Sequence, residues 1–175
     1  MANEQASAAI VRARLPAGLE RLRRRSVPDA PDGLPAHLTL LYPFVEPGRL
    51  DAAVRMAVGA IAARHAPFDY RLMGAARWPD TIYVAVEPTR PFVELQSALA
   101  AAFPDHPIYG EPPGFAFVPH VTVAEGAATD DPALIDDPAW SALARPARAT
   151  ALEVIANRGR RWQLVWRLRL GSGRR

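Results

Sequence analysis

The chain has 175 residues, of which half are hydrophobic, so it is long enough to fold as one domain with a substantial core. It contains no cysteine, which excludes disulfide bonds, thiolate nucleophiles and cysteine-rich zinc sites, and predicts a cytoplasmic protein. Because it has neither a long apolar run nor the pattern of a secretory signal in residues 1–16, we expect no membrane association.

The net charge of the chain is +3, and the calculated pI is near 9.9 because all 21 basic residues are arginines. We attribute the absence of lysine to codon bias. Several arginines are clustered, and such runs are usually solvated faces. The functional alternative is electrostatic attraction of a polyanionic substrate. The clusters comprise Arg12 and Arg14, Arg21 to Arg25, Arg158 to Arg161, and Arg167 and Arg169.

The first half of the chain predicts the order strand, helix, strand, helix, strand. Alternation of apolar and polar residues indicates the strands, and apolar residues spaced three or four apart indicate the helices. The predicted elements are a strand at 10–15, a helix at 16–25, a strand at 37–44, a helix at 48–65 and a strand at 68–74.

The second half of the chain repeats this order and adds a final strand. In the helical region 131–144, Asp131 and Asp137 each precede a proline, as an N-cap precedes a proline at the first helical position. The repeat predicts an α+β fold with two similar β-α-β-α-β lobes about a pseudo-twofold axis, forming a single domain over 1–175. The predicted elements are a strand at 81–87, a helix at 90–103, a strand at 117–126, a helix at 131–144, a hairpin of strands at 150–157 and 161–170, and a flexible tail at about 171–175.

Two short motifs occupy equivalent places in the repeat: "HLTL" at 37–40 and "HVTV" at 120–123. In a strand, residues i and i+2 point to the same face. Each motif therefore presents one imidazole and one hydroxyl on one face, while its apolar residues anchor the other face in the core. If the lobes are related by a twofold axis, the two polar pairs face each other across a cleft.

Two facing imidazoles suit acid–base catalysis, because their ordinary pKa lies near 6.5. One can accept a proton while the other donates one, and two threonine hydroxyls can hold the non-bridging oxygens of a phosphodiester. A single His-x-Thr would mean little, and the repetition in matching surroundings favours catalysis. No third ligand at a recognisable spacing accompanies the pair, so we expect no metal site. His65 is expected to end a helix and His106 to be solvated.

On the stretches "HLTLLYPF" and "FVPHVTVAEG", and on the element order over about 10–170, the chain resembles the 2H (two-histidine) phosphoesterase superfamily, which includes the 2′-5′ RNA ligase-like proteins. The resemblance implies antiparallel sheets that line a central cleft with helices outside. It implies cofactor-free, metal-independent hydrolysis of 2′,3′-cyclic phosphates or 2′-5′ phosphodiesters of RNA ends or nucleotides. By position, His37 and His120 are the acid–base pair, and Thr39 and Thr122 hold the phosphate. We expect a monomer without an obligate protein partner.

One position departs from this resemblance: many 2′-5′ RNA ligase-type members carry arginine where Glu125 stands here. This departure weakens a ligase assignment more than a phosphoesterase assignment. Candidates for substrate binding are aromatic residues near the motifs, which could stack on a base or belong to the core, and one arginine of the first strand. These candidates are Tyr42, Phe44, Tyr83, Tyr109, Phe115, Phe117 and Arg12.

Two other functions fit the same fold. One is a non-catalytic module that binds RNA ends or nucleotides, and the other is an interaction domain with a vestigial cleft. The two intact His–Thr pairs argue against the second. The division of the acid and base roles, and the choice between 2′- and 3′-phosphate products, stay open at this level.

Overall fold

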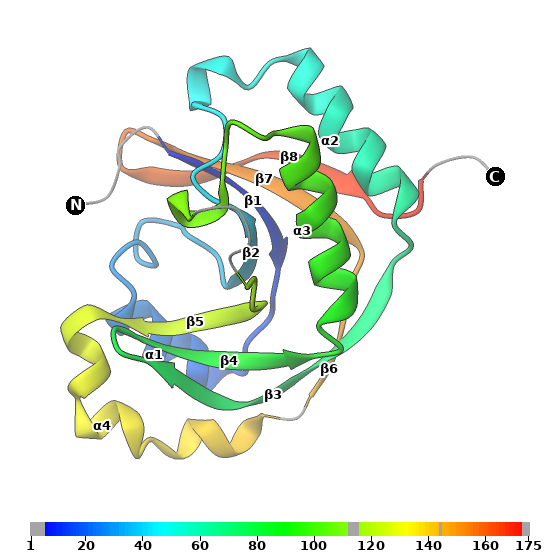
Figure 1. Ribbon diagram of the computed structural model, residues 1–175. Coiled ribbons are helices and arrows are strands. Elements are labelled where there is room, and N and C mark those ends of the chain that lie inside the picture. The colour runs from blue at the N-terminus through cyan, green and yellow to red at the C-terminus, as the bar shows by residue number, and fades with distance from the viewer. Residues whose placement is uncertain (1–5, 112–115, 144, 173–175) are drawn as a thin grey trace.

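The computed structural model describes residues 6–111, 116–143 and 145–172, and it has an α+β fold built on a curled, antiparallel sheet of eight strands (Figure 1). The order of strands across the sheet is β6-β3-β4-β5-β2-β1-β7-β8. The strands are β1 (Ser7–Arg12), β2 (His37–Leu41), β3 (Phe68–Trp78), β4 (Thr81–Glu87), β5 (His120–Glu125), β6 (Pro146–Ala149), β7 (Ala151–Arg158) and β8 (Arg161–Arg169).

The α-helices are α1 (Ala17–Ser26), α2 (Ala52–Arg64), α3 (Arg90–Ala102) and α4 (Pro132–Ile135). Helix α2 starts later than predicted because the Asp51 side chain caps it by accepting a hydrogen bond from the Val54 amide. The single helix predicted at 131–144 is wrong: a separate 3₁₀ helix, Pro138–Ala142, follows α4, and each begins at an aspartate cap. Within the described ranges, no helix is long and apolar enough to cross a membrane.

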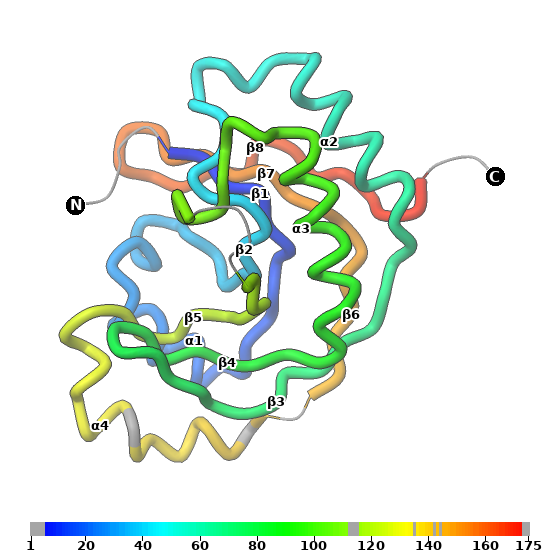
Figure 2. The backbone as a smooth tube through the Cα atoms, viewed as in Figure 1, coloured from blue at the N-terminus to red at the C-terminus, as the bar shows by residue number. Residues whose placement is uncertain are grey.

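The sheet has a pseudo-twofold arrangement about its centre, where β2 and β5 meet through the pair Leu38 and Val121. The β2 half continues through β1, β7 and β8, and the β5 half continues through β4, β3 and β6. The third strand of each sequence repeat crosses to the other half: β3 pairs with β4, and β7 pairs with β1. Figure 2 shows this crossing, with β1 from the start of the chain beside β7 from its last quarter.

Helices and sheet pack crosswise as well, since α1 lies against β5 and α3 lies against β2. The apolar residues of both motifs, Leu38, Leu40, Val121 and Val123, are fully buried in this layer. Burial of such side chains contributes about 1.5–3 kcal/mol each. The alternating pattern therefore turns the histidines and threonines to the opposite, concave face of the sheet, as predicted.

Strand β8 contains an irregularity in its pairing with β7. Ile155 pairs with Leu164 and Val154 pairs with Trp166, so Val165 is an extra residue between them. As a result Trp166 packs against the main core, whereas Trp162 packs on the concave face with Ile155. In a regular strand two residues four positions apart share a face, so the spacing of the tryptophans alone would have put both on one side.

Candidate active site

Each motif histidine is the first residue of its strand, and this position fixes its ring. His37 Nδ1 lies 2.7 Å from the carbonyl oxygen of Pro35, and His120 Nδ1 lies 2.8 Å from that of Val118. Each acceptor belongs to the residue two positions earlier, before the strand begins. A ring nitrogen this close to a carbonyl oxygen carries the proton, so Nδ1 donates in both rings.

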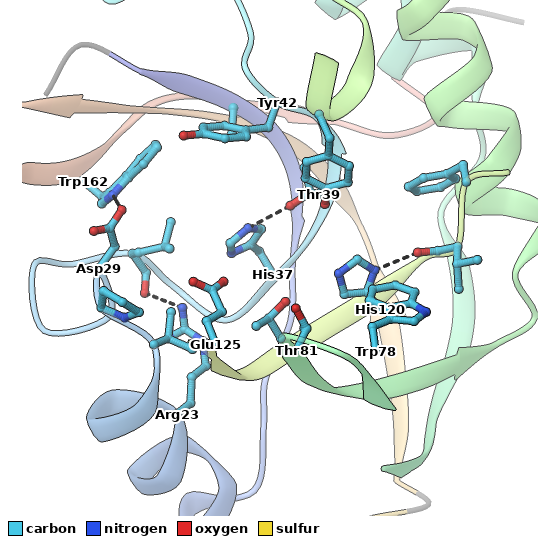
Figure 3. A pocket seen from close by; sticks show the side chains of 18 of the residues that line it. Arg23, Asp29, His37, Thr39, Tyr42, Trp78, Thr81, His120, Glu125 and Trp162 are labelled. Carbon is cyan, nitrogen blue, oxygen red and sulfur yellow. Dashed lines mark hydrogen bonds between the residues drawn. The ribbon is translucent and has the colours of Figure 1, made fainter. Parts of the chain in front are cut away.

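This bond leaves Nε2 of each histidine as the nitrogen available for chemistry. His37 Nε2 lies 3.1 Å from the Thr39 hydroxyl, which donates to it when the imidazole is neutral. Both rings and both threonines line a single cavity of about 760 Å³, into which the two halves of the sheet contribute equivalent groups (Figure 3). The structure thus brings together His37, Thr39, His120 and Thr122.

The two histidines differ in their electrostatic surroundings. The pKa of His37 is lowered from 6.5 to about 4, first because the ring is buried and then because Arg23, His120 and Arg12 add positive charge. The pKa of His120 is also lowered by burial, but no cation adds to this effect. His120 is therefore the easier of the two to protonate.

Arg23 accounts for part of the difference on the His37 side. Its side chain is only 2% exposed, and its Nη2 donates to the carbonyl oxygens of Leu34 and Pro35, each at 2.9 Å. The Pro35 oxygen is the acceptor that also holds His37 Nδ1. One buried guanidinium from α1 thus fixes the carbonyl that orients the histidine.

Aromatic rings surround His120 instead. The Trp78 ring packs edge to face on His120 at a centroid distance of 4.7 Å, and the Tyr83 ring lies at 5.2 Å. Trp78 and Tyr83 also stack on each other at 4.1 Å. Trp78 takes part because β3 runs on to that residue, beyond the end of the strand predicted at 68–74.

Of the expected binding residues, Tyr42, Tyr109 and Phe117 line the cavity. Tyr83 is buried and does not line the cavity, which corrects the expectation that it binds substrate; its ring packs against His120. Phe44 is buried in the core against Phe103, at a centroid distance of 4.9 Å, which corrects the expectation that Phe44 binds substrate. Phe115 lies outside the described residues.

Arg12 does not line the cavity either. Its Nε donates to the carboxylate of Glu153 at 2.9 Å, and Arg167 lies 3.6 Å from the other oxygen of the same group. Glu153 is only 1% exposed, so it needs such partners. The structure therefore assigns Arg12 an ion pair and an electrostatic effect on His37, in place of the expected substrate contact.

Some residues that line the cavity were not predicted from the sequence. Arg23 was grouped with solvated arginines, although its place between Leu22 and Ser26 on the buried face of α1 was a signal. Asp29 and Trp162 come from distant loops and strands and are joined by a hydrogen bond from Trp162 Nε1, 2.9 Å long. Among the residues that the structure describes, no three His, Asp or Glu side chains are grouped to hold a metal ion.

Comparison with known proteins places the chain in a family. The profile of the 2′-5′ RNA ligase superfamily matches residues 11–169. The chain belongs to this superfamily of 2H phosphoesterases. Its fold is similar to that of Escherichia coli LigT, crystallised with 3′-AMP (TM-score 0.57, 20% identity, 96% of this chain and 99% of that chain). It is also similar to TT0787 of Thermus thermophilus (TM-score 0.60, 18% identity, 97% and 100%). No curated protein matches the chain.

Proposed function

We propose that the protein is a phosphodiesterase that hydrolyses a 2′,3′-cyclic phosphate or a 2′-5′ phosphodiester of an RNA end or nucleotide. One observation carries this proposal: two His–Thr pairs from the two halves of the sheet line one cavity. In-line displacement at phosphorus needs a base on one side and an acid on the other. Membership of the superfamily supports a phosphoesterase activity, and LigT has been crystallised with a nucleotide, 3′-AMP.

In this proposal His37 is the general base and His120 the general acid. The low pKa of His37 keeps it neutral, so its Nε2 can accept a proton from the attacking water. As the water oxygen bonds to phosphorus, the bond to the leaving ribose oxygen breaks and that oxygen takes the proton from Nε2 of His120. Thr39 and Thr122 donate hydrogen bonds to the non-bridging oxygens. No step requires a metal ion.

The proposal is tested with a panel of nucleoside 2′,3′-cyclic phosphates and 2′-5′ dinucleotides, with products identified by mass spectrometry. We expect His37→Ala and His120→Ala each to lower kcat/KM by a factor of about 10² or more. The matched control is His65→Ala, because His65 follows α2 and its Nδ1 contacts the Ile61 carbonyl away from the cavity. EDTA should have no effect, and circular dichroism should confirm folding.

The pH dependence of the wild-type enzyme gives a second readout. Activity should rise as His37 loses its proton near pH 4, and fall as His120 loses its proton below pH 6.5, giving a bell with an acidic optimum. Full activity in either alanine variant would contradict the mechanism. Binding without turnover of every substrate in the panel would instead indicate a non-catalytic nucleotide-binding module.

A further inference from the structure

The cavity that holds the histidines carries more acidic than basic side chains, although the chain as a whole is basic. Of the described lining residues, three are carboxylates and, apart from the histidines, Arg23 alone is basic. The carboxylates are Asp29, Glu111 and Glu125. The cavity therefore has an excess of negative charge, which is the same sign as the charge of a substrate phosphate.

Arg23 does not offset this surplus by binding phosphate directly. Both hydrogen bonds from its Nη2 go to the Leu34 and Pro35 carbonyls, and its Nη1 lies 3.4 Å from the Glu20 carboxylate. Since the side chain is 2% exposed, its hydrogen-bonding capacity is directed into the protein. Its charge instead lowers the pKa of Glu125 and so favours the ionised form of a carboxylate that lines the same cavity.

The charge of Glu125 acts across the cavity. Figure 3 shows its carboxylate pointing into the cavity on the side of Asp29 and Arg23. Burial raises the pKa of Glu125 and repulsion by Asp29 raises it further, whereas the positive charge of Arg23 lowers it. Burial also raises the pKa of two other lining residues, Tyr42 and Tyr109, and the Glu125 charge contributes to both shifts.

Several arginines of the chain are paired elsewhere. Arg77 contacts Asp130, and Arg148 donates hydrogen bonds to both carboxylate oxygens of Asp69. None of these four residues lines the cavity. Positive charge at the surface can attract a nucleotide to the protein from a distance. It cannot cancel, at short range, the carboxylates that line the cavity.

We propose that Glu125, with Asp29, is a specificity determinant that admits substrates whose only charge is the scissile phosphodiester. This inference rests on the proposed function. A phosphodiester carries one negative charge, whereas a terminal phosphomonoester adds about 1.5 to 2 more. The preferred substrates are nucleoside 2′,3′-cyclic phosphates and 2′-5′ dinucleosides with free hydroxyl ends. Ribose hydroxyls and base amino groups can donate hydrogen bonds to the two carboxylates.

The test compares one nucleoside 2′,3′-cyclic phosphate with a 5′-hydroxyl and the same compound with a 5′-phosphate. Wild-type enzyme should prefer the 5′-hydroxyl form by about tenfold or more in kcat/KM, because like charges are brought together in the cavity. Glu125→Gln should reduce this ratio, and Glu125→Arg should reduce it further or invert it. Added salt should raise kcat/KM for the 5′-phosphorylated form in wild type and lower it in Glu125→Arg.

Glu87→Arg is the matched control, since it makes the same change of charge at an exposed position of β4 outside the cavity. Its substrate ratio should equal that of wild type. Equal kcat/KM values for the two substrates in wild type, or an unchanged ratio in Glu125→Arg, would overturn the inference.

If no substrate is turned over, the proposed function fails, and calorimetry with a nucleoside 2′-monophosphate and the corresponding 2′,5′-bisphosphate tests the charge selection alone. Tighter binding of the monophosphate, reversed in Glu125→Arg, would support it. Equal binding in both proteins would overturn it.

Discussion

His37 and His120 begin equivalent strands, and the carbonyl two residues earlier holds each ring by Nδ1, yet their side-chain surroundings are different. The His37 side contains a buried guanidinium, Arg23, and the His120 side contains the aromatic pair Trp78 and Tyr83. The repeated backbone thus places two identical groups in positions related by the pseudo-twofold axis. The residues around them, which the repeat does not copy, give the two rings different proton affinities.

This difference resolves what symmetry alone leaves open. A twofold site with two equal histidines could use either as the base, depending on how the substrate is oriented. A cation next to His37 disfavours its protonated form, so that ring suits the base. The pKa of His120 is lowered by burial and not by a neighbouring cation, so this ring suits the acid.

The two histidines should differ most on a substrate whose leaving group needs no general acid. A nucleoside 4-nitrophenyl phosphodiester releases a phenolate that leaves without a proton. His120→Ala should lose about 10² in kcat/KM on a cyclic phosphate but less than about tenfold on the aryl ester. His37→Ala should lose similar factors on both, because the attacking water still needs its base. The reverse pattern in steady-state kinetics would exchange the two roles.

A smaller effect is expected when the His37 side loses its guanidinium. Arg23→Met should lower kcat by about tenfold, because the Pro35 carbonyl that orients His37 is no longer held. Since Arg23 lowers the pKa of His37, its removal should move the acidic limb of the pH profile to higher pH.

Arg23→Lys separates charge from geometry, because it keeps the positive charge but lacks the planar fork that bridges two carbonyls. Compared with Arg23→Met, Arg23→Lys should return the acidic limb of the pH profile to its wild-type position more completely than it returns kcat to the wild-type value. The control is Arg24→Met, which removes an exposed arginine from the same helix. A limb that stays in place in Arg23→Met, with only thermal stability reduced, would give Arg23 a purely structural role.

The motif residues and the fold class could be predicted from the sequence because both depend on local patterns. The alternation of His37 and Thr39 with Leu38 and Leu40 specifies which side faces the core, and the repeat specifies a symmetric partner. Asp131 and Asp137 could be identified as helix caps for a similar reason, since a cap bonds to an amide only two residues further along the chain.

The surroundings of the site could not be predicted, because they depend on contacts between distant segments. Arg23 reaches His37 through the Pro35 carbonyl, and Trp162 enters the cavity only because of the extra residue Val165 in β8. Phe44 shows the opposite failure. It follows the first motif closely in sequence, but the chain turns it into the core against Phe103. Closeness along the chain did not determine which aromatic residues line the cavity.

The mildest change concerns the aromatic wall of His120. Trp78 is 37% exposed, so Trp78→Ala should leave the fold intact while admitting water to the His120 ring. Because burial lowers the pKa of His120, the substitution should raise it toward 6.5 and move the alkaline limb of the pH profile to higher pH, with a few-fold loss in kcat/KM. Trp78→Phe should shift the limb less. Met73→Ala, an exposed position on the same strand, should leave it unchanged. A shift of the acidic limb in Trp78→Ala would mean that the aromatic wall acts on His37, and that the two sides of the site are less separate than their contacts indicate.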